Sequence, residues 1–472
     1  MKYPASKSVL QSSIIFERGM KMKQAELASS TNSAPDQKTI RKVVISGAIG
    51  NFIEWYDLAI YSYAAIGISM VLFSEAGEFA LLYSLLAFGF TYLLRPISGV
   101  IMGAIGDRIG RKKLLVLTIS MMAIGTLCIG LIPSYAAIGI GAPILLMACR
   151  AVQGISAGGE FVGAAAYVYE FSNRKNKVFL MGLIQLGTCL CYPAAAFAAY
   201  GLGIWLGGDA FNEWGWRLLF ISAAPLGLIA LFIRSGLDES PVFKKLQENG
   251  EISASPLKDS LKYDPKRLIL TSLYVLGYNA AAVMVLLYMP IYLVNVSGFA
   301  PTEANLTMGI TGLIFGLSVP VFAWIVGRNP DNIPAFRIAS CAVFAVFVVF
   351  AYWLFTVPGG MIFGIVILGL IVGFHYALAP FTVVDVFPAA HRFTSGAIAY
   401  NVPVAIGGAL FPVLFTSLSK MGALTPPIFV ALVNVVACIC AIGLARITKE
   451  RDSTTYVPST SYNSLSKEMS KL

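Results

Sequence analysis

Apolar residues occur in long runs, and short polar segments separate one run from the next. A bilayer with a hydrocarbon core of about 30 Å needs an α-helix of roughly 20 mainly apolar residues to cross it. About twelve runs of this length follow one another between Val43 and Ile447. The pattern therefore predicts an all-α membrane protein with 12 transmembrane helices.

One long polar stretch, residues 236–267, divides the runs six and six. It predicts two six-helix bundles, residues 43–235 and 268–447, joined by a linker. The remaining segments, 1–42 and 448–472, are polar and are expected to be disordered tails.

Charge is distributed unevenly between the predicted loops on the two sides of the membrane. The chain is 57% hydrophobic and only 12% charged, with a formal net charge of +10. Lysine and arginine gather in the linker, in the loops on the linker's side and near the chain ends, whereas the opposite loops are mainly acidic. Because cytoplasmic loops carry the excess of lysine and arginine, both termini are predicted to be cytoplasmic, and nucleic-acid binding is not expected.

The residues needed for a catalytic or metal site are scarce. The chain has 2 histidines and 7 cysteines, and the cysteines all lie within apolar runs without metal-ligand spacing. No catalytic residue, metal site or cofactor is expected, and an enzyme is disfavoured.

Two acids, Glu54 and Asp57, lie within the first apolar run. A charged side chain at the bilayer centre costs roughly 2.5 to 3.5 kcal/mol, so an acid retained there is expected to face protein or water. Arg150 lies near the middle of the fourth run and is predicted to meet Asp57. A buried acid beside an arginine can serve as a proton switch, although a static ion pair is the alternative. Glu54 is expected on the same helix face, either sharing the proton or accepting a structural hydrogen bond.

Arg95 and Glu160 are further charges at membrane depth. Arg95 precedes Pro96 and is a candidate for binding a substrate carboxylate; the alternative is an arginine anchored to carbonyl groups at the helix break. Glu160 follows several glycines that favour close helix packing, and its expected partner is Arg95 or Arg150.

The carboxyl-terminal half has little charge at membrane depth, so recognition there would depend on neutral polar and aromatic residues. The candidates are Tyr278, Asn279, Tyr288, Tyr292, Tyr376 and Asn401. Tyrosines could hold a quaternary ammonium group by cation–π contact, but packing or membrane-interface roles are the commoner ones. His375 is expected to be a hydrogen-bonded core residue.

The two halves share a sequence pattern. Gly103 to Lys113 follows the second run and Gly327 to Arg337 follows the eighth, and both read Gly-x-x-x-Asp-x-Ile followed by a base. Parallel repeats of six helices are typical of transporters that rock one bundle against the other.

Several stretches resemble the metabolite:proton symporter branch of the major facilitator superfamily. They are Gly50 to Asp57, Gly103 to Lys113, Arg150 to Glu160, Trp214 to Pro241 and, more loosely, Phe387 to Asn401. The resemblance implies proton-coupled import of a small zwitterionic or carboxylated metabolite, proline/betaine-like or a di- or tricarboxylate, by alternating access. It also implies a multi-pass monomer in a bacterial inner membrane whose partners are the substrate and the lipid bilayer.

The resemblance also assigns roles to individual residues. In related porters, acids and arginines at the positions of Asp57 and Arg150 are thought to couple proton to substrate. The resemblance also implies a cytoplasmic charge cluster that controls how the two halves tilt. Its members would be Asp107, Arg111, Glu170 and Glu239, and Arg108 and Arg217 also lie near helix ends. Setting membrane topology is the alternative role for such charges. Because Asn332 and Pro334 interrupt the second copy of the loop, a matching latch in the carboxyl-terminal half is doubtful.

Two other functions of the same fold remain open, a facilitative uniporter and a nutrient-sensing transceptor. A uniporter should survive loss of the Asp57 carboxylate, and a transceptor should show no substrate flux.

Overall fold

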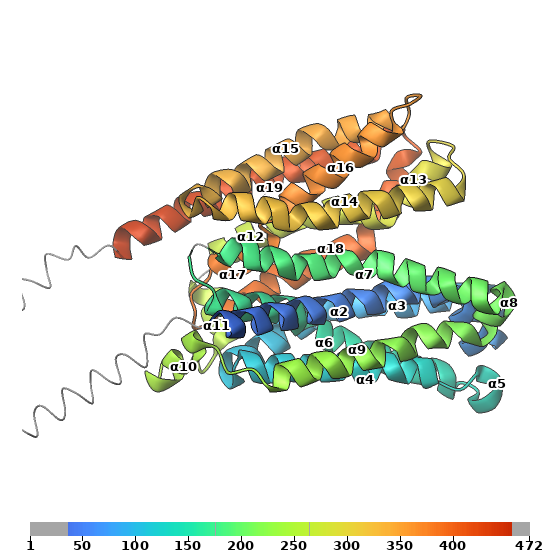
Figure 1. The fold of residues 1–472 in the computed structure, drawn as a ribbon, viewed down its shortest axis with the longest axis horizontal. Coiled ribbons are helices and arrows are strands. Elements are labelled where there is room, and N and C mark those ends of the chain that lie inside the picture. Colours follow the sequence, from blue (N-terminus) through green and yellow to red (C-terminus); the bar gives the residue numbers. More distant parts are fainter. Residues whose placement is uncertain (1–35, 175, 264, 456–472) are drawn as a thin grey trace, which may run out of the picture.

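The protein is a bundle of long helices that run side by side, as the computed structural model shows for residues 36–174, 176–263 and 265–455 (Figure 1). Within these residues, 11 helical segments are long and apolar enough to cross a membrane. One further helix, α6 (Gly141–Phe171), has 31 residues and spans about 46 Å at 1.5 Å per residue. It is less apolar because it carries Arg150, Glu160 and Glu170, which are buried inside the protein.

The helices form two groups, drawn one above the other in Figure 1. The first group contains α2 (Gln37–Leu72), α3 (Ala80–Ile109), α4 (Arg111–Leu131), α6, α7 (Lys177–Leu206) and α9 (Trp216–Ser235). The second contains α12 (Pro265–Ala282), η3 (Val283–Tyr288), α13 (Met289–Asn295), α14 (Pro301–Gly327), α15 (Ile333–Leu354), α16 (Met361–Tyr376), α17 (Ala379–Asp385), α18 (Arg392–Ser419) and α19 (Thr425–Thr455).

Short helices connect the long ones. They are η1 (Ser74–Phe79), α5 (Tyr135–Ile138), α8 (Gly208–Ala210), η2 (Phe211–Gly215), α10 (Pro241–Glu248), α11 (Pro256–Tyr263) and η4 (Pro330–Asn332). The polar linker between the bundles thus contains two helices, α10 and α11. Helix α10 begins where Ser240 accepts a hydrogen bond from the Phe243 amide and proline takes the first helical position.

The predicted tails are wrong where helices extend into them. Helix α2 begins at Gln37, because Asp36 caps it by accepting a 2.6 Å hydrogen bond from the Lys38 amide. At the other end, α19 continues to Thr455. The rest of the predicted tails, residues 1–35 and 456–472, lies outside the described residues.

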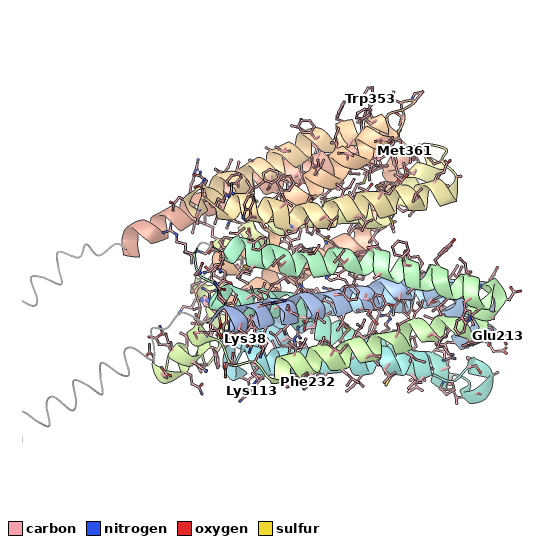
Figure 2. The ribbon with its side chains drawn as sticks, viewed as in Figure 1. Lys38, Lys113, Glu213, Phe232, Trp353 and Met361 are labelled. Carbon is pink, nitrogen blue, oxygen red and sulfur yellow. The ribbon has the colours of Figure 1, made fainter. Side chains whose placement is uncertain are left out.

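Both described chain ends lie at the same end of the molecule, here called the termini end (Figure 1). Lys38 and Lys113 also lie there, whereas Glu213, Trp353 and Met361 lie at the far end (Figure 2). Phe232, on the outer face of α9, is 81% exposed, as expected of a residue that faces lipid.

The two bundles meet along two seams, where α3 packs on α18 and α7 packs on α14. Glycines permit the close approach at the first seam: a Cβ added at Gly103 would meet the backbone of Thr394, and one at Gly99 would meet Asn401. Within the first bundle, Gly158 of α6 fits against the backbone of Ser98 and Gly99 in α3. Small residues thus set the helix spacing that brings the charged residues of α2, α3 and α6 together.

We expect Gly158→Ala to destabilise the protein by about 1 to 3 kcal/mol, because the added methyl group overlaps backbone atoms of α3 that cannot rotate away. Thermal unfolding in detergent measures the effect. Gly141→Ala on the same helix is the control, since its Cβ would meet only Ile138 at 3.6 Å. Equal unfolding temperatures for the two variants would contradict the close approach.

Candidate functional site

Asp57 of α2 and Arg150 of α6 form an ion pair in the interior of the first bundle. Arg150 Nη1 donates to Asp57 Oδ2 at 3.0 Å, and the two residues are 0% and 1% exposed, respectively. The other carboxylate oxygen accepts hydrogen bonds from Thr126 Oγ1 at 2.9 Å and from Gln153 Nε2 at 2.6 Å. The Arg150 guanidinium also lies 3.7 Å from the centroid of the Tyr61 ring. The structure therefore places the Asp57 carboxylate where its ionised form is fully hydrogen-bonded.

Gln153 and Thr126 are members of this cluster that the sequence did not reveal. Gln153 also accepts from Arg150 Nη1 at 2.9 Å and donates to Thr126 Oγ1 at 2.9 Å, so it joins the acid, the base and the hydroxyl. The sequence could have indicated Gln153, because it lies three residues after Arg150 and therefore on the same helix face.

A second ion pair joins Glu54 of α2 to Arg95 of α3. Arg95 Nη2 donates to Glu54 Oε1 at 2.7 Å, and both side chains are buried. The Arg95 guanidinium carbon lies 5.3 Å from the ring centroid of Trp55 and 5.5 Å from that of Tyr92. Glu54 and Asp57 thus each have an arginine of their own, although they lie three residues apart on one helix.

A third pair corrects the predicted partners of Glu160. Glu160 binds Arg234 of α9, not Arg95 or Arg150, and also accepts a 2.8 Å hydrogen bond from Thr118 Oγ1. Arg234 was not predicted as a partner because it lies in the last turn of an apolar run, where a topology-setting charge is common.

Arg234 connects the first bundle internally. Its Nη1 atom donates to the carbonyl of Leu115 at 2.7 Å, and its Nε atom donates to Ser46 Oγ at 3.2 Å. A side chain at Gly50 would overlap this pair. The Glu160–Arg234 pair therefore holds α2, α4, α6 and α9 together.

A narrow central cavity of about 40 Å³ lies between the two bundles. Its described lining residues are uncharged and largely aromatic. They are Trp55, Tyr92, Phe161, Gln185, Thr188, Cys189, Tyr192, Tyr278, Asn279, Ala282, Val283, Leu286, Leu287, Phe315, Tyr376, Tyr400, Val404 and Gly408. Both halves thus contribute to one enclosed surface.

The structure places only some of the predicted binding residues at this cavity. Tyr278, Asn279 and Tyr376 line it, as does Tyr400, which the sequence analysis did not select. Asn401 instead donates to the carbonyl groups of Gly158 and Ala397, each at 2.9 Å, and so joins the bundles. Of the other two tyrosines, Tyr288 donates to the Phe415 carbonyl and Tyr292 packs on Tyr352.

The cavity continues toward the far end of the molecule. An adjoining hollow of about 410 Å³ shares Cys189, Tyr192 and Leu286 with it and reaches Tyr200 and Phe211. Leu286 belongs to η3, a π-helical segment that interrupts the helix along one wall. Such interruptions are frequent at functional sites.

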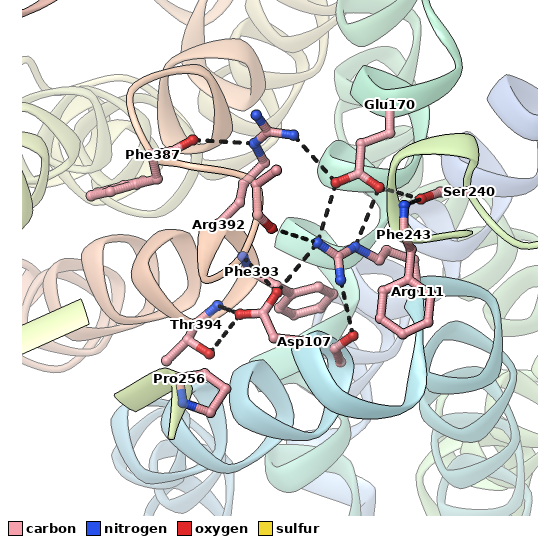
Figure 3. A network of polar contacts seen from close by, with 12 residues as sticks. Asp107, Arg111, Glu170, Ser240, Phe243, Pro256, Phe387, Arg392, Phe393 and Thr394 are labelled. Carbon is pink, nitrogen blue, oxygen red and sulfur yellow. Dashed lines mark hydrogen bonds and ion pairs between the residues drawn. The ribbon is translucent and has the colours of Figure 1, made fainter. Parts of the chain in front are cut away.

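At the termini end, by contrast, a polar network joins the bundles (Figure 3). Asp107 of α3 accepts hydrogen bonds from the Thr394 amide at 2.9 Å and hydroxyl at 2.8 Å, so it caps the first turn of α18 in the other bundle. Arg111 lies 3.3 Å from both Asp107 and Glu170. Arg392 of α18 also binds Glu170 at 3.3 Å, which completes a connection across the seam.

The other predicted members of the charge cluster are more dispersed. Glu239 accepts hydrogen bonds from the backbone amides of Arg111 and Lys112 and so holds the linker on the first turn of α4. Arg108 donates to the carbonyl of Ala254 in the linker. Arg217 was wrongly grouped with them: it binds the carbonyls of Gly130 and Ile132 at the far end of α4.

Further contacts close the termini end. Tyr169 donates to Asp385 at 2.7 Å, and Ser260 of α11 is hydrogen-bonded to Ser395 of α18 at 2.8 Å. In the second copy of the loop, Asp331 forms an exposed ion pair with Arg174. Polar contacts thus join the bundles at the termini end. A hollow of about 310 Å³ beside Arg174 and Asp331 at that end shares no lining residue with the central cavity, whereas the hollow toward the far end does.

Comparison with known proteins gave a match to the family model of the Major Facilitator Superfamily over residues 47–412. The glycine betaine/proline/ectoine/pipecolic acid transporter OusA of Dickeya dadantii is 34% identical over 384 residues, which cover 79% of this chain and 76% of OusA. The proline/betaine transporter of Escherichia coli K12 is 31% identical, with 87% of this chain and 84% of that protein covered.

Solved structures agree in fold. A double-tryptophan mutant of XylE matches with a TM-score of 0.70 at 15% identity, covering 85% of this chain and 94% of that one. The human organic anion transporter MFSD10 matches with a TM-score of 0.62 at 14% identity, covering 85% and 99%.

Asp107→Ala is expected to open the termini end, because it removes the cap that one bundle supplies to the other. A lost cap costs about 1 kcal/mol, which corresponds to a several-fold change in the ratio of closed to open molecules. Spin labels at positions 174 and 331, in a background without native cysteines, would report the change by pulsed electron resonance as longer inter-label distances. Those positions suit labelling because their side chains are 78% and 83% exposed and an exposed pair contributes little.

Arg108→Ala is the matched control, because Arg108 donates its hydrogen bond to the carbonyl of Ala254 in the linker and not to the second bundle. An unchanged distance distribution in Asp107→Ala would contradict the role of the cap.

Proposed function

Because this chain belongs to the major facilitator superfamily and is therefore a multi-pass membrane transporter and not an enzyme, we propose that it imports a small zwitterionic solute together with protons. The observation that carries the proposal is the buried Asp57–Arg150 pair, in which a carboxylate, a guanidinium, an amide and a hydroxyl are hydrogen-bonded to one another.

Asp57 is the proposed proton site. In its ionised form it accepts hydrogen bonds from Arg150, Thr126 and Gln153, which offset the cost of burial. Protonation removes the attraction to Arg150 and leaves that guanidinium without its counter-ion. Loss or gain of one proton therefore changes the interaction between α2 and α6, and this is the coupling that a symporter needs.

The substrate class follows from the central cavity. Its described lining is uncharged and rich in tyrosine, with Tyr278 and Tyr376 on one side and Tyr92 and Tyr192 on the other. Aromatic faces attract ammonium groups, and Arg95 lies behind the wall as a counterpart for a carboxylate. A di- or tricarboxylate would need more positive charge than this site offers, so a zwitterion such as proline or a betaine is favoured.

Alternating access would carry the substrate across. The proposed cycle moves from this form, closed at the termini end, to one open there, by breaking contacts such as Asp107 to Thr394. We place the termini in the cytoplasm of a bacterial cell, on the charge pattern of the loops. One chain supplies a complete cavity, so we take the monomer as the functional unit.

Purified protein in liposomes should accumulate labelled glycine betaine or proline when the interior is alkaline, and should not accumulate citrate or α-ketoglutarate. The physical reason is the match between a zwitterion and an uncharged aromatic cavity. Uptake with and without an imposed pH gradient measures it. Accumulation of the carboxylates alone would contradict the zwitterion assignment, and binding without any flux would favour a nutrient sensor.

Asp57→Asn should abolish accumulation driven by the pH gradient while leaving exchange of internal for external substrate, because the amide keeps the size of the side chain but does not titrate in this range. Asp209→Asn, in a short helix at the far end, is the control and should transport like the unmodified protein. Gradient-driven accumulation that persists in Asp57→Asn would show that the acid is not the coupling site and would favour facilitated diffusion or another proton site.

A further inference from the structure

The carboxylate of Glu54 is bonded differently from the other two carboxylates at membrane depth. Asp57 and Glu160 each use both oxygens in hydrogen bonds. Glu54 uses Oε1 alone, and within the described part of the chain its Oε2 atom has no hydrogen-bond partner. A buried polar atom without a hydrogen-bond partner costs free energy, so a further donor that binds Glu54 Oε2 would stabilise this pair.

Arg95 shows the same spare capacity. One of its nitrogens, Nη2, binds Glu54, whereas Nε and Nη1 are buried and have no partner among the residues that the structure describes. A guanidinium presents its N–H groups in a planar fork that matches a carboxylate with two parallel hydrogen bonds. Arg95 can therefore bind a carboxylate in addition to, or in place of, Glu54.

The pair lies directly behind the wall of the central cavity. Trp55 and Tyr92, whose rings flank Arg95, both line the cavity. Tyr400, a third lining residue, interacts electrostatically with both Glu54 and Arg95. Aromatic side chains alone thus separate the Arg95 guanidinium from the cavity at Trp55 and Tyr92.

Arg95 differs from the other arginines buried beside it in its position at the cavity. Arg234 binds Glu160, Ser46 and the Leu115 carbonyl. Arg150 binds Asp57 and Gln153 through Nη1, and its Nε and Nη2 atoms have no partner among the described residues, but the Tyr61 ring beside it does not line the cavity. Several ionisable groups on neighbouring helices interact with Glu54 electrostatically: Arg95 and Tyr92 of α3, Glu160 of α6, Cys191 of α7, Arg234 of α9 and Tyr400 of α18. Of these, Arg95 is the one that is hydrogen-bonded to Glu54.

We propose, on the basis of the function inferred above, that Glu54 is an internal competitor of the substrate for Arg95. The carboxylate of an arriving zwitterion takes the N–H groups of Arg95, and Glu54 loses its counter-ion. Glu54 then takes one proton from water and becomes neutral, which avoids an unpaired buried carboxylate. On release, Glu54 returns that proton and binds Arg95 again, so Arg95 faces one negative charge in both states.

This exchange predicts that removing a charged residue beside the cavity strengthens substrate binding. Glu54→Gln removes the competitor, so glycine betaine should bind about tenfold more tightly than to the unmodified protein, the size expected for one charge-assisted hydrogen bond. In the unmodified protein, affinity should rise as the pH falls, since binding takes up a proton; in Glu54→Gln this dependence should weaken. Isothermal titration calorimetry on detergent-solubilised protein measures both.

Choline serves as the matched ligand, because it has the quaternary ammonium group of glycine betaine but no carboxylate. Its affinity should be the same for the unmodified protein and for Glu54→Gln. The unpaired Arg95 could prevent the single variant from folding. The double variant Glu54→Gln/Arg95→Gln is then used instead, because it leaves the net charge of the site unchanged. That variant should bind choline normally and lose the preference for glycine betaine.

Weaker or unchanged binding of glycine betaine to a folded Glu54→Gln would overturn the exchange and leave Glu54 as a structural counter-ion or a direct ligand of the ammonium group. A double variant that keeps the preference for glycine betaine would also overturn it. Failure of the unmodified protein to bind glycine betaine at all would instead contradict the proposed substrate class.

Discussion

The cost of burying charge is the constraint on which this structure depends. Within the membrane interior of the first bundle, the carboxylates of Glu54, Asp57 and Glu160 each bind an arginine from another helix. Removing one partner of such a pair typically costs 3 to 5 kcal/mol, because it leaves an uncompensated charge. Because an unpaired buried charge is so costly, a change in the charge or the partner of one residue favours a compensating change at the other. A buried ion pair can therefore couple substrate binding to proton binding.

The three pairs differ in what surrounds them, and their proposed roles follow from that difference. Glu160 and Arg234 are tied into four helices and hold the bundle together. The oxygens of Asp57 are fully occupied by neighbours that favour the ionised acid, so protonation there changes helix contacts. The third pair lies beside the aromatic cavity, and its carboxylate has one oxygen, Glu54 Oε2, without a partner among the described residues. The proposed supporting pair thus joins α6 to α9, whereas the proposed proton site and substrate site lie three residues apart on α2.

Much of the fold was predictable because hydrophobic length and charge placement report directly on membrane crossing. The runs of apolar residues, the position of the linker and the meeting of Asp57 with Arg150 followed from such patterns. The partner of Glu160 did not, since which arginine it meets depends on helix rotation, and Arg234 lay at a helix end where charge usually has another explanation. Likewise, Asn401 and Tyr400 are neighbours in sequence, but only the three-dimensional packing decides that Tyr400 lines the cavity while Asn401 bonds to helix carbonyls.

The central claim is that entry of the solute and entry of a proton are one event. The most direct measurement is proton flux driven by substrate alone, with purified protein in liposomes that contain a pH-sensitive dye and no initial pH gradient. An inward gradient of the transported zwitterion should acidify the interior, and a proton ionophore should abolish this signal. Entry of the labelled solute without any change in internal pH would contradict the claim.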